Sequence, residues 1–419
     1  MSETAVTLLK ERYLNNIKEN PELLIGIELE FPIVNMEGEA VDLHVSKSLL
    51  SHLATSLDFD VEKYDLDRNP IQLVNKASQD RILFEVAYTT IEFAFGPVKT
   101  LSEAERRFES YLSVIQEFLR SKGHLIVGKG VNPQWASNDH QPVKLPRYQM
   151  LMDYLALGSK YPQLHQFPQY GAFICGSQVQ LDVSRSNFYR VINAFNQIEA
   201  AKAYLFANSV FDGADWDTNI SRDIFWEESM HGLLKENVGV NAADFVTEDD
   251  FFNYLCQSAM FSVQRQRKDY YFPPVSVKEY FAQEEFKAYD LSGEELILVP
   301  SEGDIATHRS YQYQDLTKRG TVEFRSVCAQ PLTQTFAPAA FHLGLLVELD
   351  RLEQYLTTAP FFELWGRDYK ALRRQFSKKE LTEEERVTIQ IFSQDLLELA
   401  KKGLLARGHE EEKYLVWND

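Results

Sequence analysis

The sequence predicts an α+β protein with one sheet built from segments that lie far apart in the chain. Apolar and polar residues alternate in five short segments spread from residue 24 to residue 328, as in half-buried strands. No repeat or Pro/Gly/Ser-rich linker divides the chain, so we expect a single domain over residues 1–419. Its core is expected at about residues 20–350, with the charged, helical residues 351–419 packed on it as an appendage.

The expected elements follow from periodicity and from helix-start signals. Alternation places every second side chain on the same face and predicts strands at residues 24–34, 82–95, 125–131, 173–183 and 320–328. Helical patterns cover residues 102–121, 187–211, 337–356 and 383–402. The first and last of these helices begin with capping-box spacing, at Thr100 with Glu103 and at Thr382 with Glu385. Gly403 is expected to end the last helix.

Composition and charge exclude several classes of protein. The chain is 44% hydrophobic and 25% charged, with a net charge of −19, which is typical of a folded globular protein. The negative charge opposes binding to nucleic acid or to a membrane surface, so neither is an expected partner. No export signal and no run of about 18 apolar residues is apparent. The three scattered cysteines match neither a disulfide framework nor a zinc site, and we expect a cytoplasmic protein.

Pairs of acidic residues occur inside the apolar strand segments. Glu28 and Glu30 are two residues apart, so they share one face of the first strand. Glu85 and Glu92 are embedded in the second segment at an odd separation, which would divide them between two faces of a regular strand. A bend or bulge at residues 87–90 would bring both to one side, and we expect one there.

Two later segments add polar side chains in the same manner. Gln178, Gln180 and Asp182 alternate with apolar residues, and Glu323 shares a face with Arg325. A solvent-exposed face of an antiparallel sheet is the ordinary explanation for such residues. An ordinary exposed face mixes Lys, Ser and Thr with Glu, whereas these four segments supply five Glu, two Gln, one Asp and one Arg. The pattern therefore favours a gathered acidic site.

Gathered carboxylates need compensation, because two of them about 4 Å apart repel by roughly 4 kcal/mol at an effective dielectric of 20. Divalent cations would provide it, and all-oxygen ligands select Mg²⁺ or Mn²⁺ over zinc. A carboxylate-held Mg²⁺ with open positions suits a triphosphate substrate. The sequence contains no P-loop, no His-Glu-x-x-His and no Gly-x-Ser-x-Gly elbow, so other enzyme templates find no support.

Taken in order, these segments resemble the glutamate–cysteine ligase family, in particular its plant-type and proteobacterial branch. The matching residues are Gly26, Glu28 and Glu30, then Glu85, then Glu92 with Gly96-Pro97, Asn132-Pro133-Gln134-Trp135, Arg147-Tyr148, Gln178-Val179-Gln180-Leu181-Asp182, Arg222 with Trp226, and Glu323-Phe324-Arg325 with Pro331. Gln180 stands where the family has Asn or His, a departure that keeps an oxygen ligand. The resemblance extends from about residue 24 to residue 350.

The resemblance implies a glutamine-synthetase-like fold, in which a mostly antiparallel curved sheet lines an active-site cleft. It implies that ATP phosphorylates the γ-carboxylate of glutamate and that the amine of cysteine then displaces phosphate, giving γ-glutamylcysteine for glutathione synthesis. It assigns Mg²⁺ ions to Glu28, Glu30, Glu85, Glu92, Gln180 and Glu323. Arg325 would stabilise the transferred phosphoryl group, with Glu323 beside it. Substrates would be bound by Arg147, Tyr148, Arg222 and Trp226.

Two alternatives stay open at the level of sequence. A relative in the same superfamily could join glutamate to a different amine, or phosphorylate without ligating, because acceptor choice depends on a few pocket contacts. A non-catalytic nucleotide-binding relative is the other alternative, and retention of all five glutamates and Arg325 argues against it. The sequence is compatible with a monomer or a homodimer.

Overall fold

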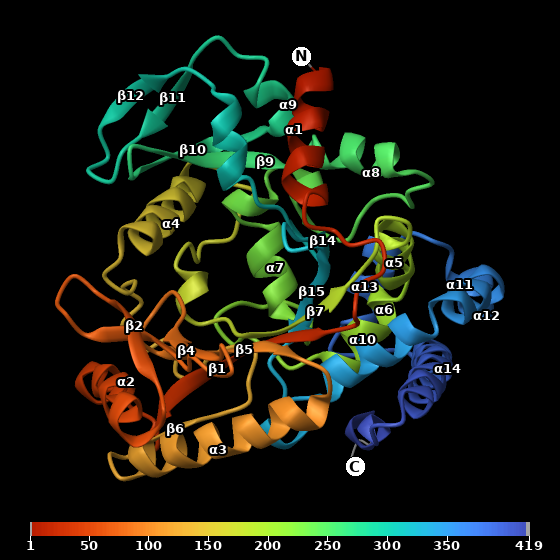
Figure 1. Ribbon diagram of the computed structural model, residues 1–419, viewed down its shortest axis with the longest axis horizontal. Coiled ribbons are helices and arrows are strands. Elements are labelled where there is room, and N and C mark those ends of the chain that lie inside the picture. Colours follow the sequence, from red (N-terminus) through yellow and green to blue (C-terminus); the bar gives the residue numbers. More distant parts are fainter. Residues whose placement is uncertain (1, 416–419) are drawn as a thin grey trace.

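The structure of the chain, a computed structural model, is described for residues 2–415. These residues form a nine-stranded sheet with the order β14-β15-β7-β1-β5-β4-β3-β2, and β6 pairs with the end of β1. Every pair in this sheet is antiparallel. Helices surround the sheet (Figure 1). The expected α+β class with a mostly antiparallel sheet is confirmed.

The strands of this sheet are β1 (Ile25–Asn35), β2 (Asp60–Tyr64), β3 (Pro70–Val74), β4 (Arg81–Phe84), β5 (Thr90–Val98), β6 (His124–Ile126), β7 (Gly176–Asp182), β14 (Gln314–Leu316) and β15 (Thr321–Cys328). A second, four-stranded antiparallel sheet contains β9 (Ala259–Arg265), β10 (Lys268–Ser276), β11 (Phe286–Tyr289) and β12 (Glu295–Leu298). A short parallel pair joins β8 (Val238–Gly239) and β13 (Tyr311–Gln312).

The α-helices are α1 (Ser2–Leu14), α2 (Leu43–Ser56), α3 (Leu101–Arg120), α4 (Pro146–Ala156), α5 (Phe188–Gln197), α6 (Glu199–Phe206), α7 (Ser221–Glu227), α8 (Glu248–Leu255), α9 (Val277–Tyr280), α10 (Ala337–Val347), α11 (Leu349–Thr358), α12 (Pro360–Trp365), α13 (Tyr369–Phe376) and α14 (Glu383–Arg407). Within residues 2–415, none of the helices combines the length and apolar character needed to span a bilayer.

The central strand β1 separates an apolar layer from a polar one. Its alternating residues Ile27, Leu29 and Phe31 are buried, and the Phe31 ring packs 5.8 Å from that of Phe108 in α3. Helix α3 buries residues at spacings of three and four, as expected of an amphipathic helix on a sheet. Figure 1 places α3 and α10 on one side of the central strands, and α4 and α7 on the other. The polar side chains of β1 therefore face the side occupied by α4 and α7.

The prediction for residues 82–95 needs correction. These residues do not form a single bulged strand, because β4 and β5 are separate strands of a hairpin in which Phe84 pairs with Ile91. The amide of Thr90 donates to the carbonyl of Ala87 at 3.3 Å, which closes the turn. A hairpin turn reverses the chain, so it brings the two acidic positions to one side as the expected bend would have done. The other expected strands form, and the one at 125–131 shortens to β6.

Three helix predictions also need correction. The expected helices at 187–211 and 337–356 are each divided in two, with breaks at Ile198 and at Glu348, and residues 207–211 are not helical. The capping box at Thr382 is confirmed, whereas the Thr100 side chain makes no capping bond. The Glu411 carboxylate accepts from the amide of Leu101 at 2.8 Å instead. A residue far along the chain thus satisfies a helix end that the local sequence leaves open.

Gly403 does not end α14, which continues to Arg407 and is capped by Gly408 in the left-handed conformation (φ 72°). Close packing of the two helices requires glycine at position 403, since a Cβ there would lie 2.1 Å from the carbonyl oxygen of Gly344 in α10. A Cβ on Gly344 would lie 2.2 Å from the carbonyl oxygen of Ala400. The C-terminal helix is therefore in backbone contact with a buried helix of the core.

We expect Gly403→Ala to destabilise the protein by about 1–3 kcal/mol, because overpacking outweighs the gain of up to about 1 kcal/mol in helix propensity. Urea denaturation followed by circular dichroism measures the difference. Lys402→Ala is the matched control at the exposed neighbouring position, where a change within about 0.5 kcal/mol is expected. A more stable Gly403→Ala variant would contradict the packing explanation.

Candidate active site

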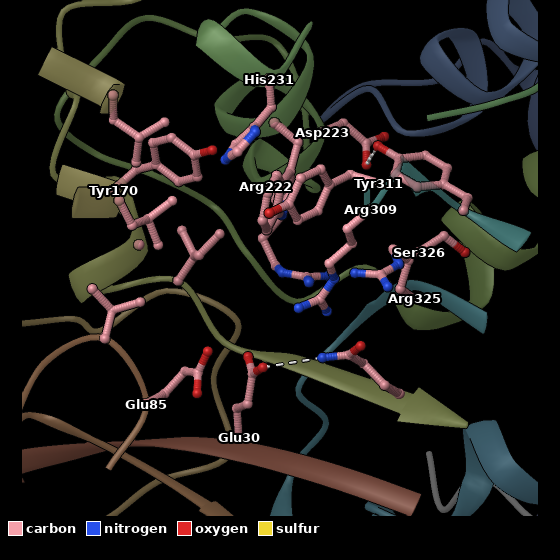
Figure 2. Close-up of a pocket in the computed structure, with 18 of the residues that line it drawn as sticks. Glu30, Glu85, Tyr170, Arg222, Asp223, His231, Arg309, Tyr311, Arg325 and Ser326 are labelled. Carbon is pink, nitrogen blue, oxygen red and sulfur yellow. Dashed lines mark hydrogen bonds between the residues drawn. The ribbon is translucent and has the colours of Figure 1, made fainter. Parts of the chain in front are cut away.

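The polar face of the central strands forms one wall of a pocket of about 970 Å³. The predicted site residues that line it are Glu30, Glu85, Arg147, Tyr148, Arg222, Trp226 and Arg325. Figure 2 shows the carboxylates of Glu30 and Glu85 on one side and the guanidinium groups of Arg222 and Arg325 facing them across the cavity. Segments far apart in the sequence therefore meet in one pocket, as the acidic pattern predicts.

Strand register gathers the predicted glutamates. Glu30 of β1 lies directly opposite Glu92 of β5, and Glu323 of β15 lies opposite Gln180 of β7. Like charges directly opposite each other on one face destabilise a sheet. Glu85 follows β4 and is close enough to hydrogen-bond with Glu92. The antiparallel order β15-β7-β1-β5-β4 thus places all five glutamates in one continuous row of strands.

Burial and like charge make these carboxyl groups difficult to ionise. Burial, with a smaller contribution from Glu323, raises the pKa of Glu28 to about 7. Burial and then Glu85 raise the pKa of Glu30 to about 7, although the amide of Gly176 donates to this carboxylate at 2.6 Å. Burial and the neighbouring carboxylates also place the pKa of Glu92 well above its ordinary value. The site is therefore short of positive charge on its acidic side.

The donor atoms are of the type that hard divalent cations prefer, because they are oxygen atoms of crowded carboxylates. Within residues 2–415, no group of three or more His, Cys, Asp and Glu residues is arranged so that it could hold a metal ion. The amide of Gln180 is turned so that its Nε2 donates to Glu28 (3.1 Å) and Glu323 (3.3 Å), while its Oε1 accepts from Arg319 at 3.0 Å. Metal coordination by Gln180 stays a prediction and requires rotation of this amide.

Arg222 and Arg325 enter the pocket with donors left over. Arg222 donates through Nη1 to the carbonyl of Val327 at 2.8 Å, and Arg325 forms an ion pair with Glu323. Among the described residues, the Nε atoms of both arginines are buried without a hydrogen-bond partner. Gly176 allows the approach of Arg222, since a Cβ there would lie 2.6 Å from its Nη2. Guanidinium groups that line a cavity are suited to binding anionic groups of a ligand.

The other predicted substrate-binding residues lie around the same pocket. Tyr148 donates to Glu85 at 3.3 Å, and Trp226 stacks on Tyr311 with ring centroids 4.9 Å apart. Arg147 lies in the first turn of α4, where it is exposed and lines the pocket. The structure thus brings every predicted residue into the pocket or directly beside it.

Sequence reasoning missed several residues of the pocket. Arg309, Tyr311 and Asp223 line it, as does His231, whose pKa burial lowers to about 3 so that the ring is neutral. The lowering of this pKa is increased by Arg309. Arg309 and Tyr311 lie in a segment without strand alternation, so periodicity gives no signal for them. A polar or charged residue on an irregular segment beside a predicted site is the only indication that the sequence offers.

A buried ion network beneath the pocket depends on Arg373 of α13. Its guanidinium donates to Asp223 at 2.8 and 2.9 Å and to the carbonyl of Ser326 at 2.9 Å, and it pairs with Glu199 at 2.5 Å. Burial alone would raise the pKa of Asp223, but Arg373 keeps it below its ordinary value. One side chain therefore fixes the neighbours of both pocket arginines, because Asp223 follows Arg222 and Ser326 follows Arg325.

We expect Arg373→Met to destabilise the protein by about 3–5 kcal/mol, because it leaves Asp223 and Glu199 buried with an incomplete set of partners. Guanidinium chloride denaturation measures the loss. Arg386→Met serves as control, since Arg386 is exposed and its contacts are a surface pair with Glu383 and a hydrogen bond to the carbonyl of Leu381 at 3.3 Å. Equal stability of the two variants would show that the network does not hold this region together.

The carboxyl groups with raised pKa predict how stability depends on pH in metal-free buffer. Between about pH 4.5 and 7 the folded chain holds protons on Glu28 and Glu30 that the unfolded chain has lost. The free energy of unfolding therefore falls as the pH rises through this range, by up to about 3 kcal/mol for each of the two groups. Thermal melts with EDTA measure the slope, and the double variant Glu28→Gln/Glu30→Gln should flatten it. Exposed Glu384→Gln is the control, and an unchanged slope in the double variant would refute the assignment.

Comparison with models of protein families identifies the class to which this fold and pocket belong. The model described as "Glutamate-cysteine ligase family 2 (GCS2)" matches residues 24–416. This match spans nearly all of the chain, so the chain belongs to glutamate–cysteine ligase family 2. The resemblance found in the sequence motifs is thereby confirmed.

The relatives are distant and longer. The chloroplastic glutamate–cysteine ligase of Solanum lycopersicum is 23% identical over 333 residues, which cover 77% of this chain and 60% of that protein. The chloroplastic glutamate–cysteine ligase A of Oryza sativa subsp. indica is 23% identical over 379 residues, covering 88% of this chain and 72% of that protein. The chain thus spans less than two thirds of the length of the tomato enzyme.

Solved structures give a similarly distant likeness. The glutamate–cysteine ligase of Francisella tularensis, determined in complex with AMP, superposes with a TM-score of 0.43 at 13% identity, covering 96% of this chain and 88% of that chain. A bifunctional glutathione synthetase from Pasteurella multocida gives a TM-score of 0.42 at 13% identity, covering 99% of this chain and 48% of that chain.

Proposed function

We propose that the protein ligates the γ-carboxylate of glutamate to the amine of cysteine at the expense of ATP. The observation that carries the proposal is the opposition, across one pocket, of the carboxylates on the sheet and the guanidinium groups of Arg222 and Arg325. Membership of a ligase family and relatives named glutamate–cysteine ligase support it. The cytoplasmic location stays a prediction.

The acidic side of the pocket is the proposed metal site. Mg²⁺, or Mn²⁺ in its place, would be held by oxygen atoms of Glu28, Glu30, Glu85, Glu92, Glu323 and Gln180, and would neutralise phosphate charge when bound. These carboxyl groups must lose their protons to bind a cation, and burial and mutual repulsion oppose that loss. Without a cation, the same carboxylates would repel the phosphates of ATP.

The basic side of the pocket is proposed to bind the anionic groups of the substrates. Arg325, held by Glu323, would stabilise the phosphoryl group as it moves to the γ-carboxylate, because phosphoryl transfer depends on positioning and charge stabilisation. Arg222 would bind the α-carboxylate of glutamate near Glu30, with Arg147 at the pocket margin. Tyr148 and Trp226 would wall the pocket and exclude water.

The proposed reaction consists of two substitution steps. The γ-carboxylate oxygen attacks the terminal phosphorus of ATP, which forms a γ-glutamyl phosphate and releases ADP. The neutral amine of cysteine then attacks the γ-carbonyl carbon, so that the C–N bond forms, the C–O bond to phosphate breaks and phosphate leaves with the electron pair. The nitrogen loses a proton and becomes the amide of γ-glutamylcysteine.

We expect purified protein to release ADP when ATP, Mg²⁺, glutamate and cysteine are present together. Glu323→Gln and Arg325→Ala should each lower turnover by about 100-fold or more, because each removes charge that acts on the transferred group. A coupled ADP assay, together with mass spectrometry of the product, measures both effects. Thermal melts control for folding. Undiminished turnover in both folded variants would end the assignment.

A further inference from the structure

A third guanidinium group, that of Arg309, projects into the pocket without a fixed partner. Arg309 lies between the short helical turn η5 (Glu302–Thr307) and β13. Within residues 2–415 its side chain has neither a hydrogen bond nor a salt bridge, and it is exposed on the pocket side. Figure 2 shows its guanidinium group between those of Arg222 and Arg325, facing the carboxylates.

The backbone on both sides of Arg309 is anchored, so the side chain starts from a fixed point at the edge of the pocket. His308 is buried and contacts Tyr13 and Ser258 through its two ring nitrogens, each at 2.8 Å. Ser310 is buried and donates to Asp315 at 2.7 Å. A solvent-exposed arginine between two buried, hydrogen-bonded residues differs from an ordinary surface arginine, because its backbone cannot swing the charge away from the pocket.

The surroundings of Arg309 favour an anion with an apolar portion beside it. The guanidinium lies 5.4 Å from the ring centroid of Tyr311, and that of Arg325 lies 5.7 Å from the same centroid. Two like charges at one ring repel each other, and an anion between them would remove the repulsion. Trp226 and the neutral ring of His231 pack against Tyr311, which gives an aromatic wall next to the cation.

On the proposed function, the substrates bring four anionic groups to the pocket besides the remaining phosphates of ATP: the transferred phosphoryl group, the two carboxylates of glutamate and the carboxylate of cysteine. Arg325 is paired with Glu323 and serves the phosphoryl group, and Arg222 lies beside Glu30 and serves the glutamate. We propose that Arg309 binds the α-carboxylate of the acceptor, with the acceptor side chain against Tyr311 and Trp226. The acceptor is therefore an α-amino acid with a compact apolar side chain, rather than a simple amine. This inference rests on the proposed function and specifies its second substrate.

The test compares L-cysteine with cysteamine, which has the same amine and thiol but lacks the carboxylate. In the wild-type protein we expect kcat/KM for cysteine to exceed that for cysteamine by about 10- to 100-fold, the worth of a charge-assisted interaction. Arg309→Ala should lower kcat/KM for cysteine and leave that for cysteamine within a few fold, so that the preference collapses. The KM values for ATP and glutamate should stay within a few fold.

The controls separate binding of the acceptor from structural effects. Arg106→Ala, at an exposed position of α3 outside the pocket, should keep the wild-type preference. Arg309→Lys retains the charge and should restore part of the preference. If Arg309→Ala fails to give a cooperative melt, the ratio of kcat/KM for cysteine to kcat/KM for cysteamine is measured in Arg309→Gln instead.

Different results would refute the proposed function and the role of Arg309. Absence of γ-glutamyl product from the wild-type protein with either acceptor would refute the proposed function itself. Ligation of cysteine with no preference over cysteamine, or with a preference that persists in the Arg309 variants, would refute the role of Arg309 alone. A selective rise in KM for glutamate or ATP would likewise refute it, by assigning Arg309 to another anion.

Discussion

The site depends on the separation of charge across one pocket. Glutamates from three strands and from the position after a fourth are gathered on one face of the sheet, where burial and mutual repulsion oppose the ionisation of Glu28, Glu30 and Glu92. The arginines that could neutralise them lie mostly on the opposite side, and within residues 2–415 Arg325 alone forms an ion pair with one of them, Glu323. A protein selected for stability alone would pair these charges or replace them. Keeping them apart leaves both sides able to bind groups of opposite charge, which is the arrangement that the proposed phosphoryl transfer requires.

The antiparallel sheet explains how the acidic side is assembled. Side chains two residues apart share a face, and register then places residues of neighbouring strands side by side. Glu30 meets Glu92, and Gln180 meets Glu323. The amide of Gln180 offsets part of the repulsion by donating to two carboxylates. Because a shift of register by one residue would send these side chains into the apolar core, the core that fixes the register also fixes the site.

Strand alternation was sufficient to predict most of the acidic side, because burial leaves a periodic signature in the sequence. Alternation could not distinguish a bulge from a hairpin around Glu85 and Glu92, because either structure places the two side chains on the same face of the sheet. Arg309 was missed because it belongs to an irregular segment, where position is set by long-range bonds of its neighbours. Gly403 was misinterpreted for a related reason. A glycine that is needed for close contact between helices cannot be distinguished in the sequence from a glycine that ends a helix.

The basic side depends on parts of the chain that no local pattern connects to it. Arg222 lies on α7 and Arg325 on β15, and the residues that follow them are both bound by Arg373 of α13. Arg373 itself is buried, and the C-terminal helix α14 packs against α10 through Gly403. The C-terminal helices therefore contribute to the position of both cations. Displacement of α13 would leave the acidic residues of the sheet in register but would move the guanidinium groups opposite them. The guanidinium groups would then no longer face the carboxylates across the pocket.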